Sequence, residues 1–248
     1  MKTTSYNKMY KFIEKFAEKK RLRNTLIALP LAVKYHEGQK RDDGEPYVMH
    51  PMRVCITLML LRPELAFREA YPRKSEKWVW KQCDVLFATS LLHDVVEDAR
   101  LPKKGKELVT VHHLSRGVLK NVRILSKPPK EKRYFWSNRY KPKRYYKKIS
   151  GSLIDSMVKP ADRKDNCKTF GVFSEKRKKK YMIENHEYIY PLCRKTKRKY
   201  PEFARIIDVL EGLIKEYVKP YEYLLNDLKT GNLTERVNTC WLSNPFIR

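Results

Sequence analysis

The chain has 248 residues, and its hydrophobic content of 42% is enough for a buried core, which excludes a disordered protein. Its formal net charge is +27, from 55 Lys and Arg against 28 Asp and Glu, so we expect either a polyanionic partner or large solvated basic faces. The five cysteines are odd in number and form no Cys-x-x-Cys pair, which excludes a disulfide framework and a zinc ribbon and favours a reducing cytosol.

The N-terminal segment and the apolar runs argue against a membrane partner. Residues 1–20 are charged throughout, whereas a signal peptide has an apolar middle. The longest apolar runs are too short to cross a bilayer. The sequence therefore predicts a cytoplasmic protein.

Long amphipathic runs and only 8 glycines favour an all-α fold with a single domain. Helices are predicted over residues 7–23, 24–35 (with Pro30 as a kink or break), 50–61, 78–97, 111–125, 139–158, 162–170, 176–193 and 203–228. We interpret residues 37–47 as a loop and 63–75 as a connection or an inserted helical hairpin.

Four ionisable residues interrupt an otherwise apolar segment: His93, Asp94, Glu97 and Asp98. At helical spacing they place an imidazole and three carboxylates within one turn. Carboxylates so close together need a cation, and a His-Asp doublet offers a divalent metal one nitrogen and one oxygen ligand. The alternative is a solvated acidic face, but the flanking leucines and valines indicate burial.

Three separated pieces of sequence carry related chemistry. They are His36 to His50, with Gln39, Arg41, Gly44 and Pro46 between them, then the His93 to Asp98 cluster, then Ala161, Asp162, Arg163 and Asn166. A His, a His-Asp doublet and a later Asp, each on its own helix, are the signature of the HD phosphohydrolase superfamily. These residues resemble the motifs of the hydrolase domain of the RelA/SpoT homologue family. The family motifs are His-x-Gly-Gln-x-Arg, Gly-x-Pro-Tyr-x-x-His-Pro, His-Asp-x-x-Glu-Asp and Ala-Asp-Arg-x-x-Asn. In the first of them, Gly38 and Gln39 stand directly after Glu37.

This resemblance implies an all-helical HD-domain bundle that hydrolyses the 3′-pyrophosphate of guanosine tetra- or pentaphosphate, normally with Mn²⁺. It implies an HD domain over residues 1–200 and a C-terminal helical extension over 201–248, packed on the same domain. By position in the motifs, it assigns metal ligation to His50, His93, Asp94 and Asp162, water activation to Glu97 and Asp98, and nucleoside binding to Arg41, Asn166 and Thr169. The mixed nitrogen and oxygen donors suit Mn²⁺ but would also accept iron or zinc.

The chain departs from the family pattern in three places. Asp42 follows Arg41 where a basic or small residue is common, and Pro160 precedes Ala161 where leucine is usual. Pro160 predicts that the helix carrying Asp162 is bent or begins there. The segment 62–80 is longer than the expected link between the two metal-bearing helices, and the remaining length points to the small alarmone hydrolase type.

Other functions stay open on the sequence. Basic residues concentrate at 127–148, with aromatic residues between them, and at 176–180 and 194–199. This mixture suits RNA, so the same centre could remove pyrophosphate from a tRNA 3′ end, an antitoxin-like role; a nucleic-acid-binding protein with a vestigial metal site is a further alternative. Solvated helix faces and core aromatics would explain the same pattern. The sequence is compatible with a guanine or an adenine nucleotide and with more than one oligomeric state.

Overall fold

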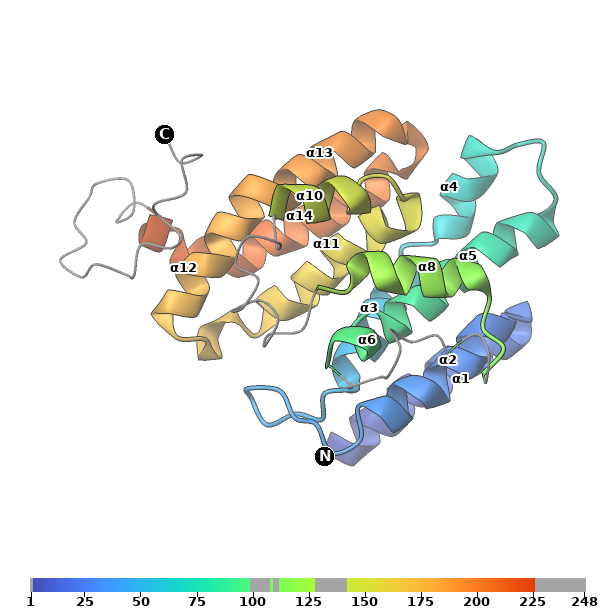
Figure 1. Ribbon diagram of the computed structural model, residues 1–248, viewed down its shortest axis with the longest axis horizontal. Coiled ribbons are helices and arrows are strands. Elements are labelled where there is room, and N and C mark those ends of the chain that lie inside the picture. The colour runs from blue at the N-terminus through green and yellow to red at the C-terminus, as the bar shows by residue number, and fades with distance from the viewer. Residues whose placement is uncertain (1, 99–107, 109–111, 128–141, 226–248) are drawn as a thin grey trace.

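The computed structural model describes residues 2–98, 108, 112–127 and 142–225, with only the backbone at 2–4 and 98. Within these residues every regular element is a helix, and the one β-type feature is an isolated bridge between Lys40 and Pro46 (Figure 1). The predicted all-α fold is therefore confirmed.

The α-helices are α1 (Lys2–Lys20), α2 (Arg23–Tyr35), α3 (Met49–Leu60), α4 (Pro63–Ala70), α5 (Glu76–Leu92), α6 (Val95–Asp98), α8 (Arg116–Leu125), α10 (Pro142–Ile149), α11 (Leu153–Lys168), α12 (Glu175–Glu184), α13 (Tyr190–Lys199) and α14 (Ala204–Val218). A π-helical turn, Asn185–Ile189, joins α12 to α13, and short 3-10 turns lie at Phe170–Val172, Pro201–Phe203 and Lys219–Tyr221.

Helices α5 and α11 form the centre of the bundle. Helix α5 packs against α2, α3, α4, α8 and α11, while α11 also packs against α3, α13 and α14. The Asp84 carboxylate of α5 accepts the backbone N–H groups of Asn24 and Thr25, which stabilises the N-terminus of α2. The packing of α3 and α5 on α11 and on each other holds these three helices together.

Serine caps decide where several helices begin. The hydroxyl groups of Ser75, Ser115, Ser152 and Ser174 each accept a backbone N–H in the first turn of α5, α8, α11 and α12. The prediction of one helix over 139–158 was wrong, because Gly151 and the Ser152 cap separate α10 from α11.

Neither proline interrupts its helix. Pro30 lies inside α2 on its exposed side, where water can hydrate the carbonyl that lacks a donor. Pro160 lies inside α11, which begins at Leu153, so the helix carrying Asp162 does not start at Pro160. Packing against α3, α5 and α14 holds α11 together across this position.

The inserted segment forms part of the body of the protein. Helix α4 packs against α5, and the Phe67 ring lies 4.9 Å from Phe203 and 6.2 Å from Trp78. Helix α14 buries Ile207, Leu210 and Ile214 and packs against α11 and α13. The division at residue 200 stays a prediction, and residues 226–248 lie outside the described part.

Among the described helices, none is long and apolar enough to cross a membrane. The four cysteines in this part of the chain, Cys55, Cys83, Cys167 and Cys193, are buried free thiols, and Cys240 lies outside it.

The Asp155 carboxyl in the first turn of α11 is fully buried, and neither oxygen makes a good hydrogen bond within the described residues. Burial raises its pKa to about 8, although Ser152 and Lys120 lower it in part. Because the unfolded carboxyl ionises near pH 4, we expect stability to fall as pH rises from about 4 to about 8, by on the order of 2–4 kcal/mol.

The variant Asp155→Asn should remove this loss, so its melting temperature should exceed that of the wild type at pH 8 but not at pH 4. The exposed carboxylate of Asp208 provides the control, Asp208→Asn. Identical pH profiles for Asp155→Asn and the wild type would show that Asp155 is ionised in the folded protein at no cost.

Candidate metal centre

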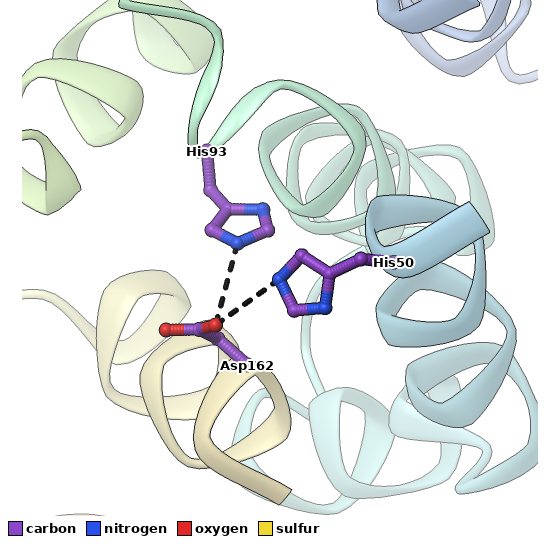
Figure 2. Close-up of side chains that lie close together, drawn as sticks. All are labelled: His50, His93 and Asp162. Atoms are coloured by element: carbon purple, nitrogen blue, oxygen red, sulfur yellow. Dashed lines mark ion pairs between the residues drawn. The ribbon is translucent and has the colours of Figure 1, made fainter. Parts of the chain in front are cut away.

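Three helices bring two histidines and an aspartate together in the interior. His50 lies in the first turn of α3, His93 follows the end of α5, and Asp162 lies in the middle of α11. One donor atom from each falls within 4.8 Å of the others, and all three side chains are buried (Figure 2).

The side chains point at one another (Figure 2). Oδ1 of Asp162 lies 3.2 Å from His50 Nε2 and 3.6 Å from His93 Nε2. Oδ2 of Asp94 lies 3.6 Å and 3.2 Å from the same two nitrogens. The four residues that the sequence predicted as metal ligands are thus gathered in one place.

Each imidazole is oriented through its other nitrogen. His93 Nδ1 lies 2.8 Å from the carbonyl oxygen of Ser90, which can only accept, so Nδ1 carries the proton. His50 Nδ1 donates in the same way to Asp165 Oδ2, at 2.7 Å. A neutral ring therefore presents a lone pair at Nε2, and the buried Nε2 of His93 has no hydrogen-bond partner among the described residues.

The electrostatics of the cluster also fit a cation. Burial opposes protonation of His50, but hydrogen bonds with Asp162, Asp165 and Asp94 outweigh it and raise its pKa to about 9. Burial also opposes protonation of His93, but Asp94 and Asp162 outweigh it and raise its pKa. Without a metal, the histidines and carboxylates share protons. Their two nitrogen and two oxygen donors are a suitable ligand set for a divalent transition metal.

Asp165 is a further buried carboxylate in contact with the cluster, and none of the sequence motifs indicated it. It lies one turn after Asp162 on α11 and is fully buried. Besides His50, it accepts hydrogen bonds from Arg53 Nε at 2.7 Å and Nη2 at 3.0 Å. The three-residue spacing from Asp162 was the available signal, because it puts both carboxylates on the same side of the helix.

We expect Asp165→Asn to weaken Mn²⁺ binding by about 10- to 100-fold, because an amide holds the His50 ring and its proton less firmly than a carboxylate does. Metal titration of the purified variant measures this, with Asp208→Asn as the control for a lost surface carboxylate. Unchanged Mn²⁺ affinity in a folded Asp165→Asn protein would remove Asp165 from the support of the site.

The helix predicted over 78–97 ends at Leu92, which corrects the expected arrangement of the acidic cluster. His93 and Asp94 lie in a turn, and Glu97 lies in the short helix α6. In a continuous helix, successive side chains would point about 100° apart. The His93 and Asp94 side chains nevertheless meet, with Asp94 Oδ2 3.2 Å from His93 Nε2.

Glu97 is half-buried, and its Oε2 accepts the backbone N–H of Lys127 at 3.0 Å. This bond ties the predicted water-activating carboxylate to the segment after α8. The side chain of Asp98 lies outside the described residues.

The three predicted nucleoside-binding residues are neighbours. Arg41 Nη2 donates to Asn166 Oδ1 at 3.1 Å and to Thr169 Oγ1 at 3.5 Å. The Asn166 amide in turn donates to Asp162 Oδ1 at 2.6 Å. These contacts connect the loop before α3 directly to the metal cluster.

Asp42, which departs from the family pattern, has an ion-pair partner in the structure. The Asp42 carboxylate forms an ion pair with Arg177 on α12, and the Arg177 guanidinium lies 3.9 Å from the centre of the Phe173 ring. Asp42 therefore joins the loop carrying Arg41 to α12.

Tyr47 supports the cluster from the same loop, because its hydroxyl donates to Asp94 Oδ2 at 2.9 Å. The His36 ring stacks on Tyr47 and its Nδ1 lies 2.8 Å from Gln39 Oε1. His36 is thus linked to the cluster through Tyr47.

Buried basic residues lie beside the cluster. Lys159 Nζ donates to Asp162 Oδ2 at 2.8 Å. Arg163 pairs with Glu184 at 2.6 Å, and this carboxylate also accepts the Tyr146 hydroxyl at 2.6 Å. Arg163 is therefore a buried ion-pair residue.

Comparison with known proteins points to one group of enzymes, although no family model matches the chain. A guanosine-3′,5′-bis(diphosphate) 3′-pyrophosphohydrolase of Vibrio cholerae is 28% identical over 162 residues, which cover 64% of this chain and 19% of the relative. The chain is a homologue of the SpoT/RelA-type hydrolases.

Further SpoT/RelA-type relatives extend the match along the chain. A guanosine-3′,5′-bis(diphosphate) 3′-pyrophosphohydrolase of Aquifex aeolicus is 28% identical over 204 residues, which cover 79% of this chain and 24% of the relative. The bifunctional (p)ppGpp synthase/hydrolase SpoT of Escherichia coli is 27% identical over 213 residues, 81% of this chain and 26% of the relative. This chain thus spans about a quarter or less of the length of these relatives.

Proposed function

We propose that this chain is a metal-dependent hydrolase of the small alarmone hydrolase type, which removes the 3′-pyrophosphate of guanosine tetra- and pentaphosphate and releases pyrophosphate. The observation that carries the proposal is the buried cluster of His50, His93, Asp94 and Asp162, with Nδ1 of each histidine already engaged. Relatives named for this reaction support the substrate class.

In this proposal, the four clustered residues hold Mn²⁺. When bound, the metal would lower the pKa of a coordinated water and neutralise charge on the phosphoryl group. The orphaned Nε2 of His93 and the mixed donor set support this assignment.

The remaining roles belong to side chains around the cluster. Arg41, Asn166 and Thr169 bind the nucleoside, with the planar Arg41 guanidinium against the base. Glu97 and Asp98 take the proton of the attacking water, whose oxygen bonds to the phosphorus attached to O3′. The bond from phosphorus to O3′ breaks, and O3′ receives a proton as pyrophosphate leaves.

Two further inferences complete the proposal. The protein works in the cytoplasm, which the free thiols of the described cysteines support. Residues 1–200 form the HD domain and 201–248 its C-terminal extension, supported by the packing of α14 on α11.

The test is to assay the purified, Mn²⁺-loaded chain against ppGpp and its adenosine counterpart, ppApp, with separation of the products. We expect nucleoside 5′-diphosphate and pyrophosphate from ppGpp, no turnover after chelation, and recovery when Mn²⁺ is restored. Release of orthophosphate, or no hydrolysis of either nucleotide by metal-loaded protein, would refute the proposal. Faster turnover of ppApp would change the base assignment only.

A second candidate is the removal of pyrophosphate from an RNA 3′ end by the same centre. The specific observation in its favour is the pair of exposed basic helices described below. A vestigial centre has less support, because the buried donors and the groups that orient them are all present.

A further inference from the structure

Helices α10 and α13 present a large group of exposed cations. The eight exposed basic side chains are Lys143, Arg144, Lys147 and Lys148 on α10 and Arg194, Lys195, Arg198 and Lys199 on α13. A hollow on α10 is lined by its four cations, and one on α13 by Arg194, Lys197 and Arg198. Neither hollow is lined by a residue of the metal cluster.

The two helices approach each other, so their cations lie on neighbouring elements (Figure 1). The Tyr146 ring of α10 stacks on Tyr188, just before α13, with ring centres 4.9 Å apart. Lys195 Nζ of α13 donates to the hydroxyl of Ser150, just after α10, at 3.0 Å. We call the eight cations the α10–α13 face.

The two helices of the α10–α13 face carry no acidic residues of their own. Neither α10 nor α13 contains an Asp or Glu, and Glu187 and Glu202 are the nearest acids before and after α13 in the chain. No ion pair within the described residues involves Arg144, Lys147, Lys148, Arg194 or Arg198. Repulsion between so many like charges is relieved by an external polyanion.

Other basic parts of the protein differ in this respect. On α1, the lysines alternate with Glu14 and Glu18. On α13 itself, Lys197 pairs with Asp208 at 2.6 Å and Glu211 at 3.2 Å. These lysines have acidic neighbours or partners, which α10 does not supply on its own helix.

The aromatic residues of α10 do not take part in this surface. Tyr145 and Tyr146 are buried, and their hydroxyl groups donate to the Leu125 carbonyl and to Glu184. They cannot stack on bases. The α10–α13 face offers charge alone, which suits contact with a phosphodiester backbone.

We propose that the α10–α13 face is a docking surface for the phosphate backbone of RNA. The choice of RNA rests on the proposed function, because a ribonucleoside with a reactive 3′ oxygen is also the end of an RNA chain. The face and the cluster are one layer of side chains apart: Tyr146 of α10 and Arg163 of α11 meet on Glu184, and Arg163 directly follows Asp162.

The experiment compares RNA binding by the full chain and two charge-matched variants. The first replaces Arg144, Lys148, Arg194 and Arg198 by Gln. The control replaces Lys8, Lys11, Lys15 and Lys19, which are exposed along α1, by Gln. Fluorescence anisotropy with a labelled 20-nucleotide RNA hairpin, and with DNA of the same sequence, gives Kd at 50 and 200 mM KCl.

For the wild type, we expect RNA affinity to fall by roughly 100-fold or more between the two salt concentrations, because about five phosphate contacts release their counterions. The α10–α13 variant should bind about 30-fold or more weakly at 50 mM KCl and respond less to salt. The α1 variant should stay within about 3-fold of the wild type, since its lysines have acidic neighbours.

Equal losses in the two variants would overturn the proposal, because binding would then follow net charge alone. DNA binding as tight as RNA binding would overturn the choice of RNA. Hydrolysis of ppGpp by the same preparations separates this proposal from the proposed function. RNA binding that depends on the α10–α13 face, without hydrolysis of ppGpp, would refute only the proposed function. Hydrolysis of ppGpp, without RNA binding that depends on this face, would refute only the docking surface.

Discussion

Asp94→Ala is expected to lose the bound Mn²⁺ and to lower turnover of ppGpp by about a thousandfold or more. Asp94 Oδ2 lies within 3.6 Å of both His50 Nε2 and His93 Nε2, so its removal takes one of four donors and one negative charge from the centre. The measurements are metal content after gel filtration and the rate of pyrophosphate release.

This variant tests the ligand better than a substitution at Asp162 would. Asp162 also pairs with the buried Lys159, and breaking a buried ion pair costs about 3–5 kcal/mol of stability. Asp94 is bonded to the Tyr47 hydroxyl, which can turn to water. Asp43→Ala, in the exposed loop before α3, is the control, and normal metal content in Asp94→Ala would refute its assignment as a ligand.

Glu97→Gln is expected to keep the fold and the metal while lowering kcat by about a hundredfold or more. The amide can still accept the Lys127 N–H through its oxygen, so the position of the side chain is preserved. What is lost is the ability to take a proton from the attacking water. Single-turnover kinetics and metal analysis of the same sample measure both quantities.

Asp98→Asn is the companion variant, because the motif pairs both acids in this role. If Asp98→Asn lost most of its turnover and Glu97→Gln kept nearly all of it, Asp98 would be the residue that takes the proton. If both variants turned over at the wild-type rate, neither acid would belong to the mechanism.

The helical class followed from local sequence, and the grouping of the four proposed ligands followed from the resemblance of the motifs to the family. Side-chain periodicity is a property of each segment, so the helices at α3 and α14 could be predicted without knowledge of their neighbours. The four motifs brought His50, His93, Asp94 and Asp162 into one hypothesis, because a metal requires donors of these types whatever the order of the chain.

Tertiary packing decided how these donors are presented. No periodicity could show that α5 stops at Leu92 so that His93 and Asp94 converge, or that α11 continues through Pro160. The role of Asp165 depends on His50 and Arg53, which are more than 100 residues away in the chain.

The basic surface shows the same division. The sequence by itself determined the excess of 27 positive charges and their concentration in runs along the chain. Only the tertiary structure placed Tyr145 and Tyr146 in the core and the cations of α10 beside those of α13. The physical reason is that charge and periodicity are properties of a segment, whereas burial and the meeting of distant side chains depend on which helix faces pack together.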